Sequence, residues 1–422
     1  MSVNTLIIGG GPAGLTAACF SAGPALVIDR LKAPARKLLA TGGGRCNLTH
    51  DTDAAGIMAA FGRQARFMSP ALHAFPPAVI RAFFRRLGVE TRVEPDGCVF
   101  PVSQKAADVA QALERAARGN GAEIRCGVRA TRLVLEPAGG GAAPELRVRA
   151  VETSHGTLPA RRVILAAGGQ SYPELGADGS GFELARAAGL NVTLPVPALA
   201  GLVTQETWPG TLAGIVLEQG GLRLDVKGAP KSLLAGPVLF THKGLSGPPA
   251  LDLSGEIASR LAGPEPLPAI PVRLSCIASR TLADWRALFE EWRSRHGGRA
   301  LHNLLAGELP RVLAATLCGL ADARDLAAAR AKKSVLEALA GACADLPLHV
   351  TGTEGWNRAM VTRGGVAVNE LEPGTLECRR IRGLYCAGEV VDLDGRCGGY
   401  NLTWAFASGR LAGQASHGPV TV

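Results

Sequence analysis

A glycine motif between two apolar runs near the start of the chain constrains the fold more than any other feature. Residues 5–8 (TLII) predict a buried parallel strand, and a Gly-x-Gly-x-x-Gly pattern follows directly at residues 9–14. A helical pattern over residues 14–22 then leads into a second apolar run, ALVIDR, which carries Asp29 near its end. A strand, a glycine turn, a helix and a second strand in this order predict a βαβ unit that binds a dinucleotide.

Each glycine of the motif meets one requirement of a bound pyrophosphate. Gly9 permits a tight turn, Gly11 lets the backbone approach the phosphates, and Gly14 lets the helix pack closely on the sheet. The helix N-terminus then points unpaired N–H groups at the phosphates. Asp29 lies where a carboxylate accepts hydrogen bonds from a ribose diol, so the sequence predicts FAD or NAD rather than NADP.

Composition places the chain among globular enzymes. Its 422 residues, 47% of them hydrophobic, are enough for two or three domains. The start shows neither a basic n-region nor an apolar run of the ~18 residues that a membrane helix needs. The ten cysteines form no CxxC pair. We therefore expect a cytoplasmic protein with reduced thiols, no metal centre and no membrane partner.

The formal net charge of +9 comes from 45 Lys and Arg against 36 Asp and Glu. This excess fits an anionic cofactor, an anionic substrate or a nucleic acid, and it fits equally well a compositional bias without functional meaning. Basic residues concentrate at 83–95 and 280–333. No RNA-binding motif accompanies them, so the charge permits RNA as a partner without establishing it.

Further glycine segments recur along the chain, separated by a long excursion. RVILAAGG (162–169) and GLYCAGE (383–389) each read as a buried strand that runs into a glycine turn. Between them, short apolar runs such as LRLDVKG and GPVLFTHKGLSGPPALDLS alternate with Gly and Pro turns and predict a β-rich region. A helical pattern follows from residue 279, with Thr281 as the expected N-cap. We expect a discontinuous cofactor domain at 1–190 and 354–422, an inserted β-barrel at 191–278, and an inserted helical domain with the return at 279–353.

Six segments occur in one order along nearly the whole chain: KLLATGGGRCNLTH, GCVFPVSQKAADVAQAL, LAAGGQSYPELGADGSGFELA, LFTHKGLSGPPALDLS, TRGGVAVNELEPGTLE and GLYCAGEVVDLDGRCGGYNLTWAFASG. With these segments in this order, the chain resembles the BaiN-like flavoproteins, an aminoacetone-oxidase family of NAD(P)/FAD-dependent oxidoreductases. The resemblance implies an α/β fold, namely a glutathione-reductase-type Rossmann FAD-binding domain with an inserted small β-barrel and a helical cap. It also implies non-covalent FAD. Since no second GxGxxG unit is visible, NAD(P)H is expected only as a transient electron donor.

In this resemblance two glycine loops wrap around one FAD. TGGGRCN forms a second cradle, in which Arg36 or Lys37 and Arg45 neutralise the pyrophosphate. Glu389 points towards the ribityl chain, and the N-terminus of the last helix faces the flavin pyrimidine edge. The expected cofactor-binding residues are Gly9, Gly11, Pro12, Ala13, Gly14, Asp29, Arg30, Arg36, Lys37, Thr41, Gly42, Gly43, Gly44, Arg45, Cys46, Asn47, Val128, Ala166, Ala167, Gly168, Gly388, Glu389, Gly398, Gly399, Tyr400, Asn401 and Leu402.

Three side chains are candidates for catalysis, and each has a structural alternative. Cys46 is either a covalent or proton-donating thiol, or a small side chain packed against the flavin. Tyr172 is either a proton donor or an aromatic plug over the cofactor. His242 reaches substrate from an inserted lid, or it is a structural histidine in a strand turn.

The expected reaction is hydride transfer from reduced flavin to a conjugated C=C bond of an organic or nucleobase substrate. The resemblance implies two such substrates, steroid enones and a uracil ring of ribosomal RNA. The missing CxxC argues against disulfide reductase chemistry. Two other functions stay open, an FAD-dependent amine oxidase and a flavin-binding sensory or structural protein with slow turnover. The oligomeric state is not predicted.

Overall fold

The computed structural model describes residues 3–139 and 146–416, and the chain divides into two compact units. The first unit comprises residues 1–196 and 360–422, and the second comprises residues 197–359. Each has its own hydrophobic core. The predicted division into three parts at residues 190, 278 and 353 stays a prediction; the sheet and the helices of the second unit share one core.

The first unit is built on a parallel sheet that confirms the predicted Rossmann-type fold. Its central strands are apolar where both faces of the sheet are covered, as the fully buried residues 6–7 and 163–165 show. The strand pairs run parallel from β6 through β2 and β1 to β9 and β21. The bounds are β1 Val3–Ile8, β2 Ala25–Asp29, β6 Glu123–Cys126, β9 Gly156–Leu165 and β21 Leu384–Cys386.

An antiparallel extension continues this sheet on one side. Strands β7 (Ala130–Pro137), β8 (Leu146–Thr153) and β9 form a meander, and the short strand β20 (Ile381–Arg382) pairs with β8. After the edge strand β6, the meander therefore leads the chain to the central strand β9 without an intervening helix.

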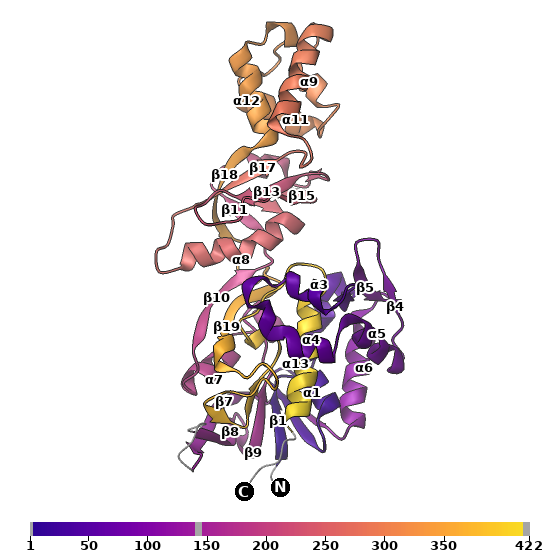
Figure 1. The fold of residues 1–422 in the computed structure, drawn as a ribbon, viewed down its shortest axis with the longest axis vertical. Helices are drawn as coiled ribbons and strands as arrows, with labels where there is room; N and C mark the ends of the chain where they lie inside the picture. The colour runs from indigo at the N-terminus through magenta and orange to yellow at the C-terminus, as the bar shows by residue number, and fades with distance from the viewer. Residues whose placement is uncertain (1–2, 140–145, 417–422) are drawn as a thin grey trace. The chain divides into compact units, whose positions relative to one another are not determined.

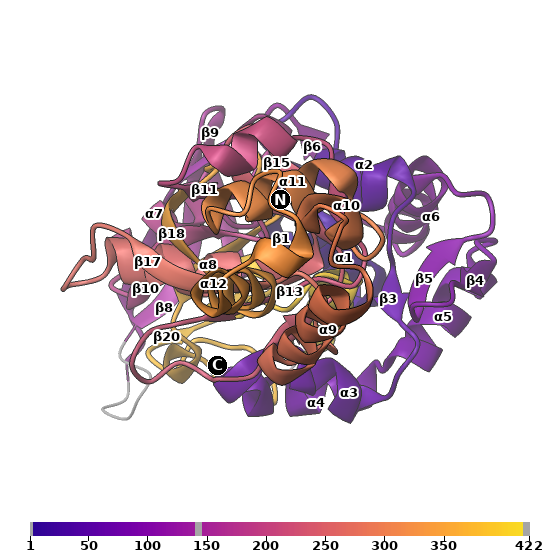
Figure 2. The same ribbon diagram turned by 90° about the horizontal axis from the view of Figure 1, so that it is seen from above.

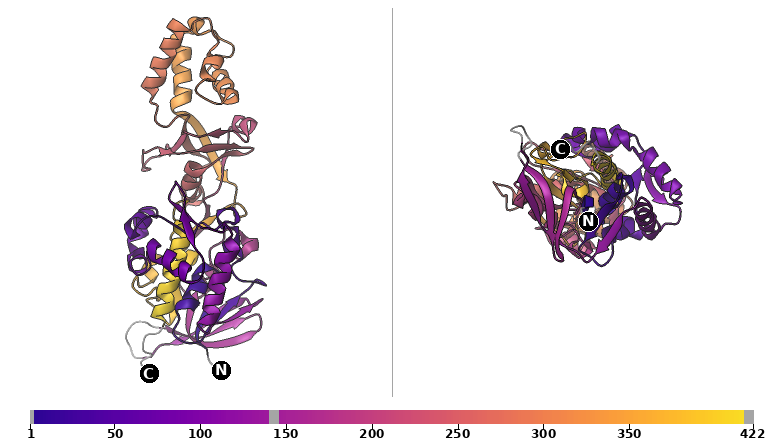
Figure 3. Two further views of the ribbon diagram at one scale, coloured as in Figure 1. Left: turned by 90° about the vertical axis from the view of Figure 1, so that its right-hand side faces the viewer. Right: turned by 90° about the horizontal axis from the view of Figure 1, so that it is seen from below.

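Helix α1 (Pro12–Phe20) lies between α6 (Ala106–Gly119) and α13 (Tyr400–Ala415), as Figures 1 and 3 show. Residues 13–18 of α1 are all buried, which explains why its sequence is apolar all round. The contact with α13 depends on glycine: a Cβ at Gly409 would lie 2.3 Å from the carbonyl oxygen of Ala13, and a Cβ at Gly413 would lie 2.5 Å from that of Ala17. The two backbones approach this closely only because both positions lack a side chain.

A helical segment fills the chain between β2 and β6. In Figure 2, α5 lies beside a small antiparallel sheet of order β3–β5–β4, and α3 and α4 lie next to each other. The elements are α2 Arg36–Ala40, a 3₁₀ turn Thr41–Gly44, β3 Thr49–His50, α3 Ala54–Ala59, α4 Ser69–Ala74, α5 Pro77–Arg86, β4 Thr91–Val93 and β5 Cys98–Pro101. Later in the first unit come α7 (Ser180–Ala187) and a two-stranded ribbon of β10 (Val192–Ala198) and β19 (Val361–Val366), which carries the chain out of this unit and back.

In the second unit, the predicted small barrel takes the form of an eight-stranded antiparallel sheet. Its order is β12–β15–β16–β11–β18–β17–β13–β14. The bounds are β11 Leu202–Thr204, β12 Val216–Leu217, β13 Gly221–Leu224, β14 Leu234–Ala235, β15 Val238–Thr241, β16 Gly244–Ser246, β17 Ile270–Ser275 and β18 Leu346–Thr353.

The β-rich prediction is wrong for one part of this unit. Residues within PPALDLS begin α8 (Pro248–Ala262), a helix of 15 residues. Pro248 and Pro249 occupy its first turn, where a missing N–H costs nothing and a fixed φ favours the helix. Its buried residues include positions 250, 253, 254, 257 and 258, which recur at helical spacing.

The helical prediction from residue 279 is confirmed. Helix α9 (Leu282–Arg295) begins after Thr281, whose side chain accepts from the N–H of Asp284 while the Asp284 carboxylate accepts from the N–H of Thr281. This is the expected capping box. The remaining helices are α10 Leu301–Leu305, α11 Arg311–Leu320 and α12 Lys333–Ala344. Among the helices of the described ranges, none combines the length and the apolar character needed to cross a membrane.

Candidate functional site

Four glycine-containing loops leave the same edge of the parallel sheet in the first unit. Strands β1, β2, β9 and β21 are parallel neighbours, with Ile8 opposite both Ile28 and Leu165, and Leu165 opposite Cys386. Their carboxyl ends therefore lie side by side. In open α/β sheets this edge is where ligands bind.

The first glycine loop is tightly packed everywhere except at Gly11. Gly9 has a φ of +108°, and a Cβ there would lie 2.3 Å from the carbonyl oxygen of Ala166. A Cβ at Gly14 would lie 1.9 Å from the carbonyl oxygen of Gly9. A Cβ at Gly11, in contrast, would meet no atom within 4 Å. Since α1 starts at Pro12 without a side-chain cap, its N-terminal N–H groups and this open space fit a pyrophosphate.

Asp29 is anchored to the same loop. One carboxylate oxygen accepts from the N–H of Gly10 and the other from the N–H of Leu31, each at 2.8 Å. The N–H of Val128 donates to the carbonyl of Asp29 at 2.9 Å, so Val128 also lies at the end of β2. The predicted contact of Asp29 with a ribose stays a prediction, and its carboxylate keeps lone pairs for it.

Four cations were expected near the cofactor, and three of them have protein partners. Arg30 donates to the carbonyls of Pro173 and Gly176 and pairs with Asp178. Arg45 stacks 4.1 Å above the Phe100 ring and pairs with Glu94. Lys37 pairs with Glu389. Arg36 is exposed, and within the described residues its guanidinium has no hydrogen-bonded or ionic partner. Of the three cations expected to neutralise the pyrophosphate, Arg36 is thus the one available.

The Lys37–Glu389 pair belongs to a polar cluster of Lys37, Ser171, Thr362 and Glu389, which we call the polar clamp. The Lys37 ammonium donates to Glu389 at 2.6 Å and to the Ser171 hydroxyl at 2.5 Å. Glu389 accepts from the Ser171 hydroxyl and from the N–H of Thr362, both at 2.9 Å. Ser171 and Thr362 are buried, and both charged side chains are about one-fifth exposed. Glu389 thus faces Lys37, and its predicted contact with the ribityl chain stays a prediction.

The second glycine loop and the start of α13 are backbone-lined. Gly42, Gly43 and Gly44 after Thr41 have φ values between +57° and +87°, a region that glycine adopts without strain. Helix α13 begins after Gly398 and Gly399, also at positive φ, and has no side-chain N-cap. A helix start without a side-chain N-cap can offer N–H groups to a ligand.

Side chains of α13 hold the segment between β21 and α13 in place. The N–H of Gly388 donates to Ser408 and its carbonyl accepts from the Trp404 indole. Asn401, next to Leu402, bonds to both backbone groups of Gly395. Asn401 therefore fixes the loop before the helix, and its predicted cofactor contact stays a prediction.

A histidine that the sequence analysis missed lies beside this helix start. The Nδ1 atom of His50 is 3.1 Å from the carbonyl oxygen of Gly398, and its ring stacks on Tyr400 with centroids 4.8 Å apart. Asn47 accepts from the N–H of Val99 at 3.3 Å, which ties the same segment to β5. His50 follows the TGGGRCNLT segment directly, so its proximity to the glycine loop was the available signal.

The three candidate catalytic residues have different surroundings in the structure. Cys46 is fully buried with a φ of +64°, and burial raises the pKa of its thiol to about 12. This favours the packed side chain over a reactive thiol. Tyr172 is partly buried, has a φ of +53°, and directly follows Ser171 of the polar clamp. His242 is exposed in the two-residue turn between β15 and β16 of the second unit. The roles of Tyr172 and His242 stay predictions.

Thiol labelling tests the assignment of Cys46. Of the ten cysteines, Cys397 is the exposed one, so iodoacetamide at about pH 8 should modify it first. Cys46 should stay unmodified until the protein unfolds, because its buried thiol remains protonated. Peptide mass spectrometry at increasing labelling times gives the order. Modification of Cys46 as fast as that of Cys397 would show an accessible thiolate and contradict the packing role.

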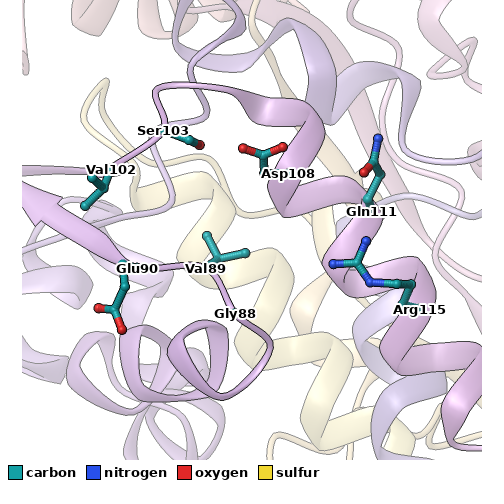
Figure 4. Close-up of a pocket in the computed structure, with 8 residues that line it drawn as sticks. All are labelled: Gly88, Val89, Glu90, Val102, Ser103, Asp108, Gln111 and Arg115. Atoms are coloured by element: carbon teal, nitrogen blue, oxygen red, sulfur yellow. The ribbon is translucent and has the colours of Figure 1, made fainter.

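A polar pocket lies elsewhere in the first unit (Figure 4). It is bounded by residues 88–90, residues 102–103 and the side chains of Asp108, Gln111 and Arg115 on α6. None of the predicted cofactor-binding or catalytic residues lines it. The carboxyl edge of the sheet, rather than this pocket, is thus the candidate site.

The fold and this edge define a Rossmann-type FAD-binding domain of the flavoprotein oxidoreductase class. A family profile described as "HI0933-like protein Rossmann domain" matches residues 3–415. The chain belongs to this family.

Two curated relatives match almost end to end. The 3-dehydro-bile acid delta(4,6)-reductase of Clostridium scindens is 34% identical over 97% of this chain and 98% of its own length. The ribosomal RNA dihydrouridine synthase of Escherichia coli is 32% identical over 96% of each chain. Among solved structures, the 3-ketosteroid delta1-dehydrogenase of Sterolibacterium denitrificans matches with a TM-score of 0.51 at 12% identity, over 98% of this chain and 99% of its own. That similarity concerns the fold alone.

Proposed function

We propose that this chain is an FAD-dependent reductase that saturates a C=C bond conjugated to a carbonyl group, with NAD(P)H as electron donor. One observation carries the proposal: two full-length relatives, at 34% and 32% identity, are named for the saturation of a ring double bond. One acts on a 3-dehydro-bile acid and the other on uridine in ribosomal RNA. The chemistry shared by both is a hydride acceptor in a ring next to a carbonyl.

The residues of the carboxyl edge fit this task. Gly11 and the start of α1 would hold the pyrophosphate, and Arg36 would neutralise it. The N–H groups at the start of α13 would stabilise negative charge on the cofactor. Reduced FAD, when bound, supplies the hydride. Tyr172 is our proposed proton donor in the first unit, since Cys46 is buried with a raised pKa.

The charge distribution favours RNA over a steroid as substrate. Residues 293–333 hold eight Lys and Arg against three Asp and Glu, which is +5 of the net +9. Six of these cations are exposed and have no ionic partner within the described residues: Arg299, Arg311, Arg324, Arg330, Lys332 and Lys333. Backbone bonds hold residues 297–301 against residues 326–329, so several of them share one surface. Such a surface binds phosphates without reading sequence.

An anaerobic experiment tests the reaction. NADH or NADPH should bleach the yellow flavin, and a substrate with a conjugated C=C bond should restore the colour. Unmodified ribosomal RNA made by transcription should gain two hydrogens on a uracil base, measured by nucleoside mass spectrometry, and a 4,6-dien-3-one steroid should serve as the comparison. Bleaching by an amine, with peroxide formed on readmitting air, would instead identify an amine oxidase.

A pair of double variants tests RNA binding. Lys332→Gln with Lys333→Gln should weaken binding and lower the magnitude of the log–log salt slope by roughly 1.4 to 1.8, because two phosphate contacts are lost. The matched control is Lys227→Gln with Lys231→Gln, which removes two exposed lysines elsewhere in the second unit. Filter binding over a salt series gives both slopes. Equal slopes for the two variants would assign no phosphate contacts to residues 332–333.

A further inference from the structure

The polar clamp joins four segments that are distant in sequence. Lys37 follows the first βαβ unit, Ser171 follows β9, Glu389 follows β21, and Thr362 lies in β19. Thr362 also accepts from the N–H of Gln170 through its hydroxyl, at 2.7 Å. The first residues after the chain re-enters the first unit at Met360 are therefore bonded to two of the cofactor loops.

We propose that Lys37 and Glu389 are positioning residues, not cofactor ligands, and that the polar clamp fixes the returning chain onto the loops of the cofactor site. This inference rests on the proposed cofactor site for its functional meaning. The two charges neutralise each other at 2.6 Å, and each is bonded further to Ser171. A Lys37 that turned to a pyrophosphate would leave Glu389 partly buried without its counter-ion, which is unfavourable.

The sequence around Gly169 supports the same assignment. A Cβ at Gly169 would lie 2.3 Å from the Thr362 hydroxyl oxygen and 2.9 Å from a carboxylate oxygen of Glu389. The second glycine of the AAGG segment is thus required by the clamp, which occupies the space that its side chain would fill. The neighbouring Arg36 is exposed and unpaired within the described residues. Two adjacent cations therefore have different tasks, with Arg36 towards the phosphates and Lys37 towards the protein.

Four variants, measured first without FAD, separate the two roles. Lys37→Met and Glu389→Gln should each lower the melting temperature of the apoprotein by about 5 °C. They should also speed hydrogen exchange in peptides covering residues 166–171 and 360–366. The double variant K37M/E389Q should recover at least half of the lost melting temperature, because neither charge is then left unpaired. The control Arg36→Met should leave the apoprotein unchanged and weaken FAD binding alone.

The opposite pattern would overturn the proposal. It is refuted if K37M keeps the wild-type melting temperature and exchange rates while weakening FAD binding as much as R36M does. If K37M does not fold, Lys37→Arg decides instead: retention of melting temperature, exchange and FAD affinity together supports the pair, whereas loss of FAD affinity in a stable K37R protein contradicts it. Failure of the wild type to bind FAD would refute the proposed cofactor site and leave the apoprotein results intact, so the two failures are distinguishable.

Discussion

Replacing Gly11 with valine is expected to abolish FAD binding while leaving the apoprotein as stable as the wild type. Gly11 has a φ of −78° and a ψ of −175°, a conformation open to any residue, and its Cβ would meet no protein atom within 4 Å. The new side chain would instead fill the space proposed for the pyrophosphate. We expect FAD affinity to fall by at least about 100-fold, equivalent to ~2.7 kcal/mol. Flavin fluorescence titration and a thermal melt of the apoprotein measure the two effects.

Gly14→Val is the matched control, because a Cβ there would lie 1.9 Å from the carbonyl oxygen of Gly9. This variant should lose apoprotein stability as well as FAD. The interpretation that the pyrophosphate lies against the backbone at Gly11 would fail if Gly11→Val bound FAD normally. It would also fail if Gly11→Val melted as early as Gly14→Val.

The second large effect is expected at the contact between α1 and α13. Gly409→Ala should destabilise the first unit by about 2–3 kcal/mol, because the added Cβ would lie 2.3 Å from the carbonyl oxygen of Ala13 and would push the helices apart. Gly341→Ala, in the interior of α12, makes the same chemical change where a Cβ meets nothing within 4 Å. There we expect stabilisation by ~0.5–1 kcal/mol.

Denaturant melts of the two variants give the free energies of unfolding, and opposite signs are the expected result. If Gly409→Ala were as harmless as Gly341→Ala, α13 could shift away from α1 at little cost. Close packing of the two helices would then not explain the glycines at 409 and 413.

Local signals in the sequence predicted the elements whose stabilising contacts are also local. The first βαβ unit was predicted because its glycines, helix and Asp29 lie within 25 residues, and α9 because both members of its capping box lie within four. Helix α8 was missed because Gly247, Pro248 and Pro249 resemble a turn between strands. The burial pattern that defines the helix appears only after them.

Contacts between side chains far apart in the chain could not be predicted from the sequence. Lys37 and Glu389 are 352 residues apart, and each was predicted to bind the cofactor because the family resemblance implies it. The sequence located these segments at one site but could not show that the two charges satisfy each other. The stacking of His50 on Tyr400, 350 residues apart, has the same cause.

The contact of α13 with α1 also has a consequence for the order in which the protein can form during synthesis. The second unit has its own core, which is complete once residue 359 has been made. The first unit begins earlier but ends later, since the side of α1 that packs on α13 stays uncovered until residues 400–415 leave the ribosome. The nascent chain therefore carries one exposed apolar side of α1 through most of translation, and the inserted unit is expected to fold before the domain that surrounds it in the sequence.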